Sequence, residues 1–298
     1  MKKVFPPSEL PINDDGSVFH LHITPDQLAD RIILVGDPGR VPTVANHFET
    51  IECEVSSREF HTITGTYKGK RITALSSGIG CDNIDIVMNE LDALANIDLT
   101  SRTEKDEHRT LTIVRVGTCG GLQPDTPIGT FVASVKSIGF DGLLNYYGNY
   151  EQVCDLELED AFKAHMDWSP RKGAPYAVTA NQELIDRIAG TEMLKGITIA
   201  CGGFYGPQGR QIRIPIQDND QNSKIESFKY IDHTKETPVE MKICNFEMES
   251  SALAGLSAHL GHKAMTCCMV VANRYAQEID TNYKSSIDDL ITLVLERI

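Results

Sequence analysis

Short apolar runs that are nearly continuous, rather than alternating with polar residues, constrain the fold of this chain more than any other feature of its sequence. They occupy residues 31–35, 71–75, 111–116, 130–135, 197–200 and 265–272. Continuous runs of this length are typical of strands that are buried on both faces of a sheet, whereas half-exposed strands alternate. We therefore expect a central sheet that other elements largely cover.

Helical patterns fall between some of these runs. In residues 82–95 apolar side chains recur at three- and four-residue spacings, as on one face of a helix. Residues 246–260 are rich in Ala and Leu and are followed by Gly261, a residue that favours a helix end. Residues 287–298 have the pattern of a terminal helix. Strands mixed with helices in this way predict an α/β fold.

The domain organisation is simple. No linker rich in Pro, Gly or Ser divides the 298 residues, and no internal repeat is present. The polar stretches 100–110 and 217–240 are interpreted as loops or excursions. We predict one domain over residues 1–298.

Composition excludes several functional classes. The net charge is −14, which argues against a nucleic-acid surface because phosphate backbones are bound by basic faces. No apolar run approaches the roughly 18 residues of a membrane span, and the N-terminal residues lack the apolar stretch of a signal peptide. The eight cysteines include no Cys-x-x-Cys pair, which fits a reducing compartment. We expect a cytoplasmic protein with no nucleic-acid and no membrane partner.

Histidines suggest no metal site. The pairs His20-x-His22 and His259-x-x-His262 have no Cys or acidic companion at the spacing of metal ligands. We therefore predict no metal.

A charged residue interrupts one apolar strand. Arg115 lies within the run 111–116, where an unpaired charge would be unfavourable. It must therefore meet either an internal carboxylate or a bound anion. Gly117, Gly120 and Gly121, with the Thr118 hydroxyl just beyond the strand, are compatible with an anion site. The pattern is neither a dinucleotide fingerprint nor a Walker A loop, so no nucleotide cofactor is indicated.

Three further segments contain side chains suited to a small polar ligand. Residues 35–40 follow a strand and end in Arg40, whose planar donor fork suits phosphate oxygens. Residues 245–251 contain acidic groups where a helix is expected to open, with Asn245 as its N-cap. A carboxylate fixed there could bind paired sugar hydroxyls. Residues 204–210 combine an aromatic residue, an amide and an arginine around a glycine turn. Taken singly, each segment also fits a turn, a capped helix or a loop.

In this order, the four segments resemble the uridine phosphorylase branch of the nucleoside phosphorylase superfamily. Further matching segments are 18–21, 57–60, 77–80 and 271–274, so the resemblance runs from about residue 18 to about residue 279. It implies a single-domain, three-layer α/β/α sandwich with a central mixed sheet. Members of this branch are shorter, which implies an N-terminal extension over residues 1–16 and insertions near 139–175 and 217–240.

The resemblance also implies roles for individual residues, and no covalent nucleophile. The phosphate site would contain Gly36, Arg40, Arg115, Thr118 and, from a neighbouring subunit, Arg58. The ribose site would contain Glu249, helped by Glu247 and Met248, and the neighbour's His20. The base site would contain Phe204, Gln208 and Arg210. The residues expected to contribute most to catalysis are Arg210, Gln208, Glu249 and Arg115.

Cofactors and assembly follow from the same resemblance. Inorganic phosphate is expected as a co-substrate, and no cofactor is expected. Some relatives hold a structural monovalent cation near the positions of Glu59 and Ile79, but Asn83 stands here where a serine is expected, so we predict no metal. A homodimer unit with shared sites is expected, with further assembly as far as a hexamer left open.

The resemblance implies phosphorolysis of uridine, and three alternatives compete with it. A purine nucleoside phosphorylase would carry an aspartate after the last sheet strand, where this chain has Asn273-Arg274. A nucleosidase that uses water has no need of three phosphate arginines. An inactive nucleoside-binding module would not need Arg40, Arg115, Glu249 and Arg210 together.

Overall fold

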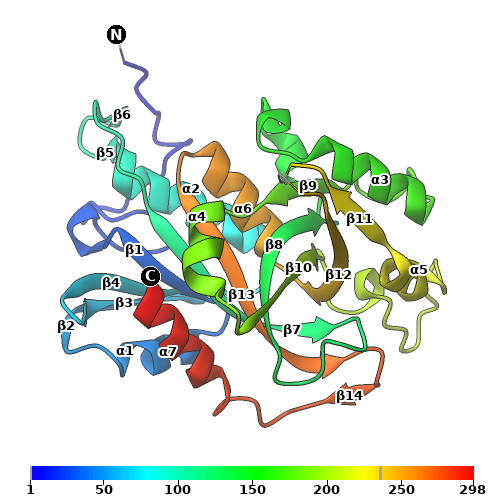
Figure 1. Ribbon diagram of the computed structural model, residues 1–298. Coiled ribbons are helices and arrows are strands. Elements are labelled where there is room, and N and C mark those ends of the chain that lie inside the picture. Colours follow the sequence, from blue (N-terminus) through cyan, green and yellow to red (C-terminus); the bar gives the residue numbers. More distant parts are fainter. Residues whose placement is uncertain (1, 235–236) are drawn as a thin grey trace.

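One large mixed sheet runs through the computed structural model, which describes residues 2–234 and 237–298 (Figure 1). The described strands follow the order β11-β12-β10-β8-β13-β7-β1-β4-β3-β2, with β14 beside β13 and β9 beside β8. Their bounds are β1 Arg31–Val35, β2 Thr50–Ser57, β3 Phe60–Tyr67, β4 Lys70–Ser76, β7 Thr112–Gly121, β8 Phe131–Gly139, β9 Tyr176–Thr179, β10 Met193–Ala200, β11 Lys229–Asp232, β12 Val239–Glu247, β13 Lys263–Asn273 and β14 Glu278–Ile279. A separate small hairpin joins β5 (Ile97–Asp98) to β6 (Thr103–Glu104).

Part of the sheet closes on itself. Strand β7 is parallel to β1 and β13, while β10 is parallel to β8 and β12. Two antiparallel pairings connect these groups: β13 with β8, and β12 with β7. The second pairing places Gly120 opposite Phe246 and Gly121 opposite Asn245. The ends of β7 and β12 therefore meet at one edge, where side chains from distant parts of the sequence lie close together.

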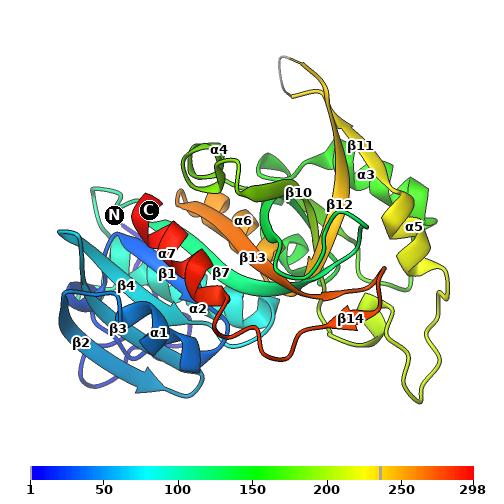
Figure 2. The same cartoon turned by 60° about the horizontal axis from the view of Figure 1, so that its bottom comes forward.

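Helices cover both faces of the sheet (Figures 1 and 2). Alternate residues of β1 show the two faces: Ile33 and Val35 pack in the hydrophobic cluster that contains α7, whereas Ile32 and Leu34 pack in the cluster that contains α2 and α6. The helix bounds are α1 Val41–Ala45, α2 Cys81–Asn96, α3 Leu156–Met166, α4 Gln182–Leu184, α5 Gln221–Ser227, α6 Ser250–His259 and α7 Ile287–Arg297. Shorter 3-10 or π turns are η1 Pro25–Gln27, η2 Pro38–Arg40, η3 Leu143–Tyr146, η4 Tyr150–Gln152, η5 Ile185–Ala189 and η6 Gly206–Gln208. The predicted α/β fold with a covered mixed sheet is confirmed.

The apolar runs form strands, as predicted, and several strands extend further. Strand β7 continues to Gly121, so the glycines and Thr118 lie within the strand and not beyond it. The predicted helices 82–95 and 287–298 correspond to α2 and α7. The polar stretches are not simple loops, because 100–110 contains β6 and 217–240 contains α5, β11 and the start of β12.

The predicted helix 246–260 is wrong at its start. Residues 246 and 247 are still in β12, because this strand pairs with both β10 and β7 up to that point. Helix α6 begins at Ser250 with Glu249 as its N-cap. Asn245 is therefore not a cap, and its side chain accepts a hydrogen bond from the Thr198 hydroxyl at 2.8 Å. Within the described residues, no helix has the length and apolar character required to span a bilayer.

Candidate functional site

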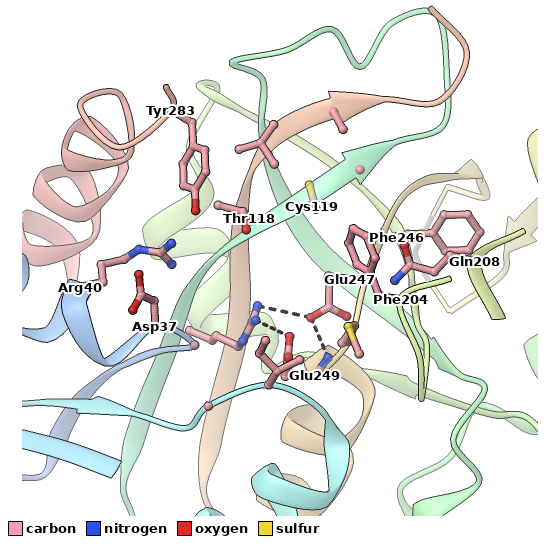
Figure 3. A pocket seen from close by; sticks show the side chains of 18 of the residues that line it. Asp37, Arg40, Thr118, Cys119, Phe204, Gln208, Phe246, Glu247, Glu249 and Tyr283 are labelled. Carbon is pink, nitrogen blue, oxygen red and sulfur yellow. Dashed lines mark hydrogen bonds and ion pairs between the residues drawn. The ribbon is translucent and has the colours of Figure 1, made fainter. Parts of the chain in front are cut away.

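A cavity of about 700 Å³ lies where the ends of β1, β7 and β12 approach one another. It brings together ten of the predicted site residues: Gly36, Arg40, Arg115, Thr118, Phe204, Gln208, Arg210, Glu247, Met248 and Glu249. Figure 3 shows Arg40 and Tyr283 at one end, Phe204 and Gln208 at the other, and Glu247 and Glu249 between them. The cavity is therefore elongated. It has a cationic group at one end, acidic groups in the middle, and an aromatic ring with an amide at the other end.

Arg40 supplies a buried positive charge that has no carboxylate partner. The turn η2 follows β1, and Asp37 caps it by accepting a hydrogen bond from the Gly39 N–H at 2.8 Å. Arg40 is only 8% exposed, and its guanidinium donates to the Val116 carbonyl at 3.3 Å. Among the described residues no Asp or Glu lies within ion-pair distance of it. Burial lowers the pKa of Arg40, as expected for a cation without a counter-charge.

Arg115 also has a buried guanidinium, but its charge is paired. It forms ion pairs with Glu249 and, at 3.3 Å, with Glu247. Of the two alternatives predicted for Arg115, the internal carboxylates are therefore present, and the side chain still lines the cavity. Burial opposes its charge, but the neighbouring carboxylates raise the pKa of Arg115 above its ordinary value.

Gly117 makes room for that guanidinium. Residues two apart on a strand point to the same face, so the side chain of Arg115 lies over Gly117. A Cβ atom at Gly117 would lie 2.3 Å from a terminal nitrogen of Arg115. The absence of a side chain at this position therefore allows Arg115 to reach the two carboxylates.

The acidic pair is fixed by the start of α6. The Glu247 carboxylate accepts hydrogen bonds from the backbone N–H groups of Glu249 and Ser250 and from the Ser250 hydroxyl at 2.6 Å. The Glu249 carboxylate accepts from the Gly80 N–H at 2.7 Å. Burial raises the pKa of Glu247, although Arg115 and the Ser250 donors act in the opposite direction. Both carboxylates therefore have defined positions in the cavity wall.

The loop after β10 carries the remaining polar groups. The Arg210 guanidinium stacks on the Phe204 ring at 3.8 Å from its centroid, and it donates to the Phe204 carbonyl at 2.6 Å and to the Gln208 side-chain oxygen. Burial, followed by the neighbouring charge of Arg274, lowers the pKa of Arg210 to about 10. The aromatic face, the amide and the guanidinium thus form one preassembled unit that is suited to a flat heterocycle.

Two predicted residues do not line the cavity of their own chain. Arg58 is exposed at the turn between β2 and β3, with a positive φ of 54°. His20 is held by Glu90, through its ring nitrogen at 2.6 Å and its backbone N–H at 2.9 Å. Their predicted contribution from a neighbouring subunit stays a prediction.

Several lining residues were not predicted from the sequence. They include Asp37, Cys119, Phe246, Val271, Ile279 and Tyr283. Asp37 and Cys119 lie within motifs that were recognised, so their positions could have indicated a role. No sequence signal marked Tyr283, which reaches the cavity from the segment before α7.

The resemblance places the structural cation of some relatives near Glu59 and Ile79. Glu59, Ile79 and Asn83 lie along the same cavity. In the part of the chain that the structure describes, no group of three or more His, Cys, Asp or Glu side chains is arranged to hold a metal ion.

The family model described as the phosphorylase superfamily matches residues 30–298, and the chain belongs to this superfamily. A uridine phosphorylase of Thermococcus kodakarensis is 28% identical over 282 residues, which cover 93% of this chain and 85% of that protein. A DeoD-type purine nucleoside phosphorylase of Bacillus subtilis is 23% identical over 282 residues, which cover 94% of this chain and 98% of that protein.

Solved structures give the same family relationship. The crystal structure of a Trypanosoma brucei nucleoside phosphorylase, described as showing uridine phosphorylase activity, has a TM-score of 0.84 and 28% sequence identity. The match covers 97% of this chain and 98% of that one. The resemblance inferred from the sequence motifs is thereby confirmed, at the level of a nucleoside phosphorylase.

Proposed function

We propose that this protein catalyses the reversible phosphorolysis of uridine to uracil and ribose 1-phosphate. The observation that carries the proposal is the unpaired, buried charge of Arg40 at the cavity wall, close to Arg115 and Thr118. A buried cation without a counter-charge is unfavourable unless an anion joins it. A phosphate dianion at this end of the cavity would supply that charge.

The remaining groups fit the two other parts of the substrate. Glu249, assisted by Glu247 and Met248, would bind the 2′- and 3′-hydroxyls of the ribose in the middle of the cavity. Phe204 would stack on the uracil ring, while Gln208 and Arg210 would hydrogen-bond its polar edge. Phosphate is then held against the anomeric carbon from the side opposite the base, which favours reaction through proximity.

The reaction needs no covalent enzyme intermediate. A phosphate oxygen forms the bond to the anomeric carbon while the bond to the uracil nitrogen breaks, and the bonding electron pair departs with uracil. Negative charge therefore develops on the base as positive charge develops on the sugar. Arg210 and Gln208 would stabilise the negative charge on the base, and the phosphate dianion would stabilise the positive charge on the sugar. These interactions accelerate the reaction only as far as they strengthen toward the transition state.

A second subunit completes the proposed site. His20 and Arg58 stand outside their own cavity, so we propose that each serves the partner's site in a homodimer, at the 5′-hydroxyl and the phosphate respectively. Closed two-fold dimers are the commonest homo-oligomers, and their symmetry would give each subunit's site the same partner residues.

Purine phosphorolysis is the competing function, because purine nucleoside phosphorylases are among the relatives. In a purine-specific site an acid is needed near the ring nitrogen. Here the side chain of Asn273 is engaged in structural hydrogen bonds, donating to the Thr126 carbonyl at 2.7 Å and accepting from the Ala276 N–H at 2.7 Å. An amide is not an acid, so Asn273 offers no proton to a purine ring, and these hydrogen bonds hold its side chain in place.

The test is a comparison of uridine, thymidine and inosine, with and without phosphate. We expect cleavage of uridine to require phosphate and to release ribose 1-phosphate, with inosine a poor substrate. Equal uridine cleavage in phosphate-free buffer would favour a nucleosidase. An inosine kcat/KM that matches or exceeds the uridine value would favour the purine function.

A further inference from the structure

Asp141 is an acidic residue that the proposed reaction does not use. It lies just beyond the end of β8, and its carboxyl group is partly buried behind the cavity wall without lining the cavity. In the described part of the chain no Lys, Arg or His lies within ion-pair distance of it. Burial raises the pKa of Asp141. A carboxylate held by neutral donors alone is unfavourable, which suggests that this arrangement serves the site.

The donors to Asp141 come from elements that are distant in the sequence. Its Oδ1 atom accepts from the Leu143 N–H at 2.8 Å and from the Tyr176 hydroxyl at 2.9 Å. Its Oδ2 atom accepts from the Ser251 hydroxyl at 3.2 Å. The hydroxyl oxygens of Tyr176 and Ser251 are themselves 3.0 Å apart, so the three side chains lie in mutual contact as one polar network.

The backbone leaves space for this network. A Cβ atom at Gly139, the last residue of β8, would lie 2.5 Å from the Tyr176 ring and 2.7 Å from the Ser251 hydroxyl. The Tyr176 side chain is fully buried, so it has little freedom to move aside. The close packing therefore leaves this network little room to rearrange.

The network ends on the first turn of α6. Ser251 is two residues after Glu249, which occupies the N-cap position of this helix and carries the carboxylate of the proposed ribose site. Glu247 already holds the N–H groups of Glu249 and Ser250. Asp141 holds the following residue, Ser251, by accepting a hydrogen bond from its hydroxyl. The start of the helix is thus fixed from two directions, by a carboxylate in the cavity and by one behind it.

We propose that Asp141, acting through Ser251 and Tyr176, is a positioning residue that sets Glu249 against the sugar hydroxyls and thereby determines the preference for ribose over 2′-deoxyribose. The inference rests on the proposed function, because it assumes that Glu249 binds the 2′-hydroxyl. Such a residue acts on the sugar-binding middle of the cavity and leaves the phosphate end, formed by Arg40 and Thr118, unchanged.

The test compares the parent enzyme with Asp141→Asn and Tyr176→Phe, which keep the shape of each side chain. We expect kcat/KM for uridine to fall about five- to tenfold, as for the loss of a hydrogen bond of about 1 kcal/mol. With 2′-deoxyuridine, which lacks the hydroxyl concerned, the decrease should be smaller, so the ratio of the two kcat/KM values moves toward one. The KM for phosphate should change by less than about twofold.

A purely structural role gives a different result. It would lower kcat equally for both nucleosides, by reducing the active fraction, and leave their ratio unchanged; that outcome would overturn the inference. A parent enzyme with no preference for uridine over 2′-deoxyuridine would also overturn it. If Asp141→Asn does not fold, Tyr176→Phe, which removes a single hydroxyl, decides the question. Absence of phosphate-dependent cleavage by the parent would instead refute the proposed function itself.

Discussion

Arg40 and Arg115 lie at the same end of the cavity but have different surroundings. Arg115 forms ion pairs with two buried carboxylates, whereas Arg40 has only a carbonyl group as partner. Removal of Arg115 leaves Glu247 and Glu249 buried without a cation, while removal of Arg40 removes an unpaired charge. The two arginines should therefore contribute differently to stability even if both bind phosphate.

We predict that Arg115→Met lowers the free energy of unfolding by about 3–5 kcal/mol, as for other broken buried ion pairs. Arg40→Met should stay within about 1 kcal/mol of the parent, since methionine keeps the apolar part of the side chain. Both variants should lose phosphate-dependent activity. Urea unfolding of the two proteins measures the difference, and equal losses of stability would contradict the pairing seen in the structure.

The effect of Arg115→Met should also depend on pH. Burial raises the pKa of Glu247 in the folded protein, and the charge of Arg115 partly offsets this effect. The pKa of Glu247 should therefore be still higher in the Arg115→Met variant. At pH values between the pKa of Glu247 in the unfolded state and its higher pKa in the folded state, the folded state binds more protons. The free energy of unfolding therefore falls as the pH rises through this range. The difference in the free energy of unfolding between the parent and the variant should therefore be larger at pH 8 than at pH 5. The control is Glu247→Gln in the same background, which should remove most of this dependence.

Among the elements, the transition from β12 to α6 places the acidic pair. The sequence predicted a helix at 246–260, because this segment is rich in Ala and Leu, is followed by Gly261 and has acidic residues near its start. Pairing with β10 and β7 keeps residues 246 and 247 extended, and this pairing is non-local, so local periodicity could not detect it. The sequence did not predict the hairpin of β2 and β3, because β2 is mostly exposed and β3, although mostly buried, is rich in Thr, so neither has an apolar run.

Strand β7 offers a test of how an element shapes the site. We predict that Gly117→Ala displaces the Arg115 guanidinium, because the new methyl group would lie 2.3 Å from it. The KM for phosphate should rise about tenfold or more, while the circular dichroism spectrum stays unchanged. The matched control is Gly148→Ala, where a Cβ atom meets nothing within 4 Å. A Gly117→Ala enzyme with parental phosphate kinetics would show that Arg115 does not need this space.

For the whole molecule, the sequence predicted the α/β class and most central strands, because buried strands have a strong local signal. The site segments were identified through their ordered resemblance to a family, and the structure brings ten of those residues to one cavity. Residues that lie behind the cavity wall, or that reach the cavity from distant parts of the sequence, belong to no recognisable motif or apolar run. Asp141 and Tyr283 are examples, since their positions depend on how α6 and the segment before α7 pack.

The proposed sharing of sites between subunits can be tested by complementation. We predict that Arg58→Ala and Glu249→Gln are each nearly inactive alone, but that their co-expression restores activity. In a mixed dimer one site combines the intact Glu249 of one subunit with the intact Arg58 of the other. Random pairing of equal amounts gives about one quarter of the parental sites. Failure to recover activity in purified mixed dimers would place Arg58 in the site of its own chain or outside any site.

The position of β7 between β1 and β13 has a consequence for synthesis on the ribosome. Strands β1, β4 and β7 are translated early, whereas β13 follows more than a hundred residues after β7. During that interval the backbone N–H and C=O groups along one edge of β7 have no partner strand, and an open edge is a template for pairing with other chains. Completion of the sheet therefore coincides with completion of the cavity, since Tyr283 follows shortly after β13. A nascent chain that stops before β13 should depend on chaperones to remain unaggregated.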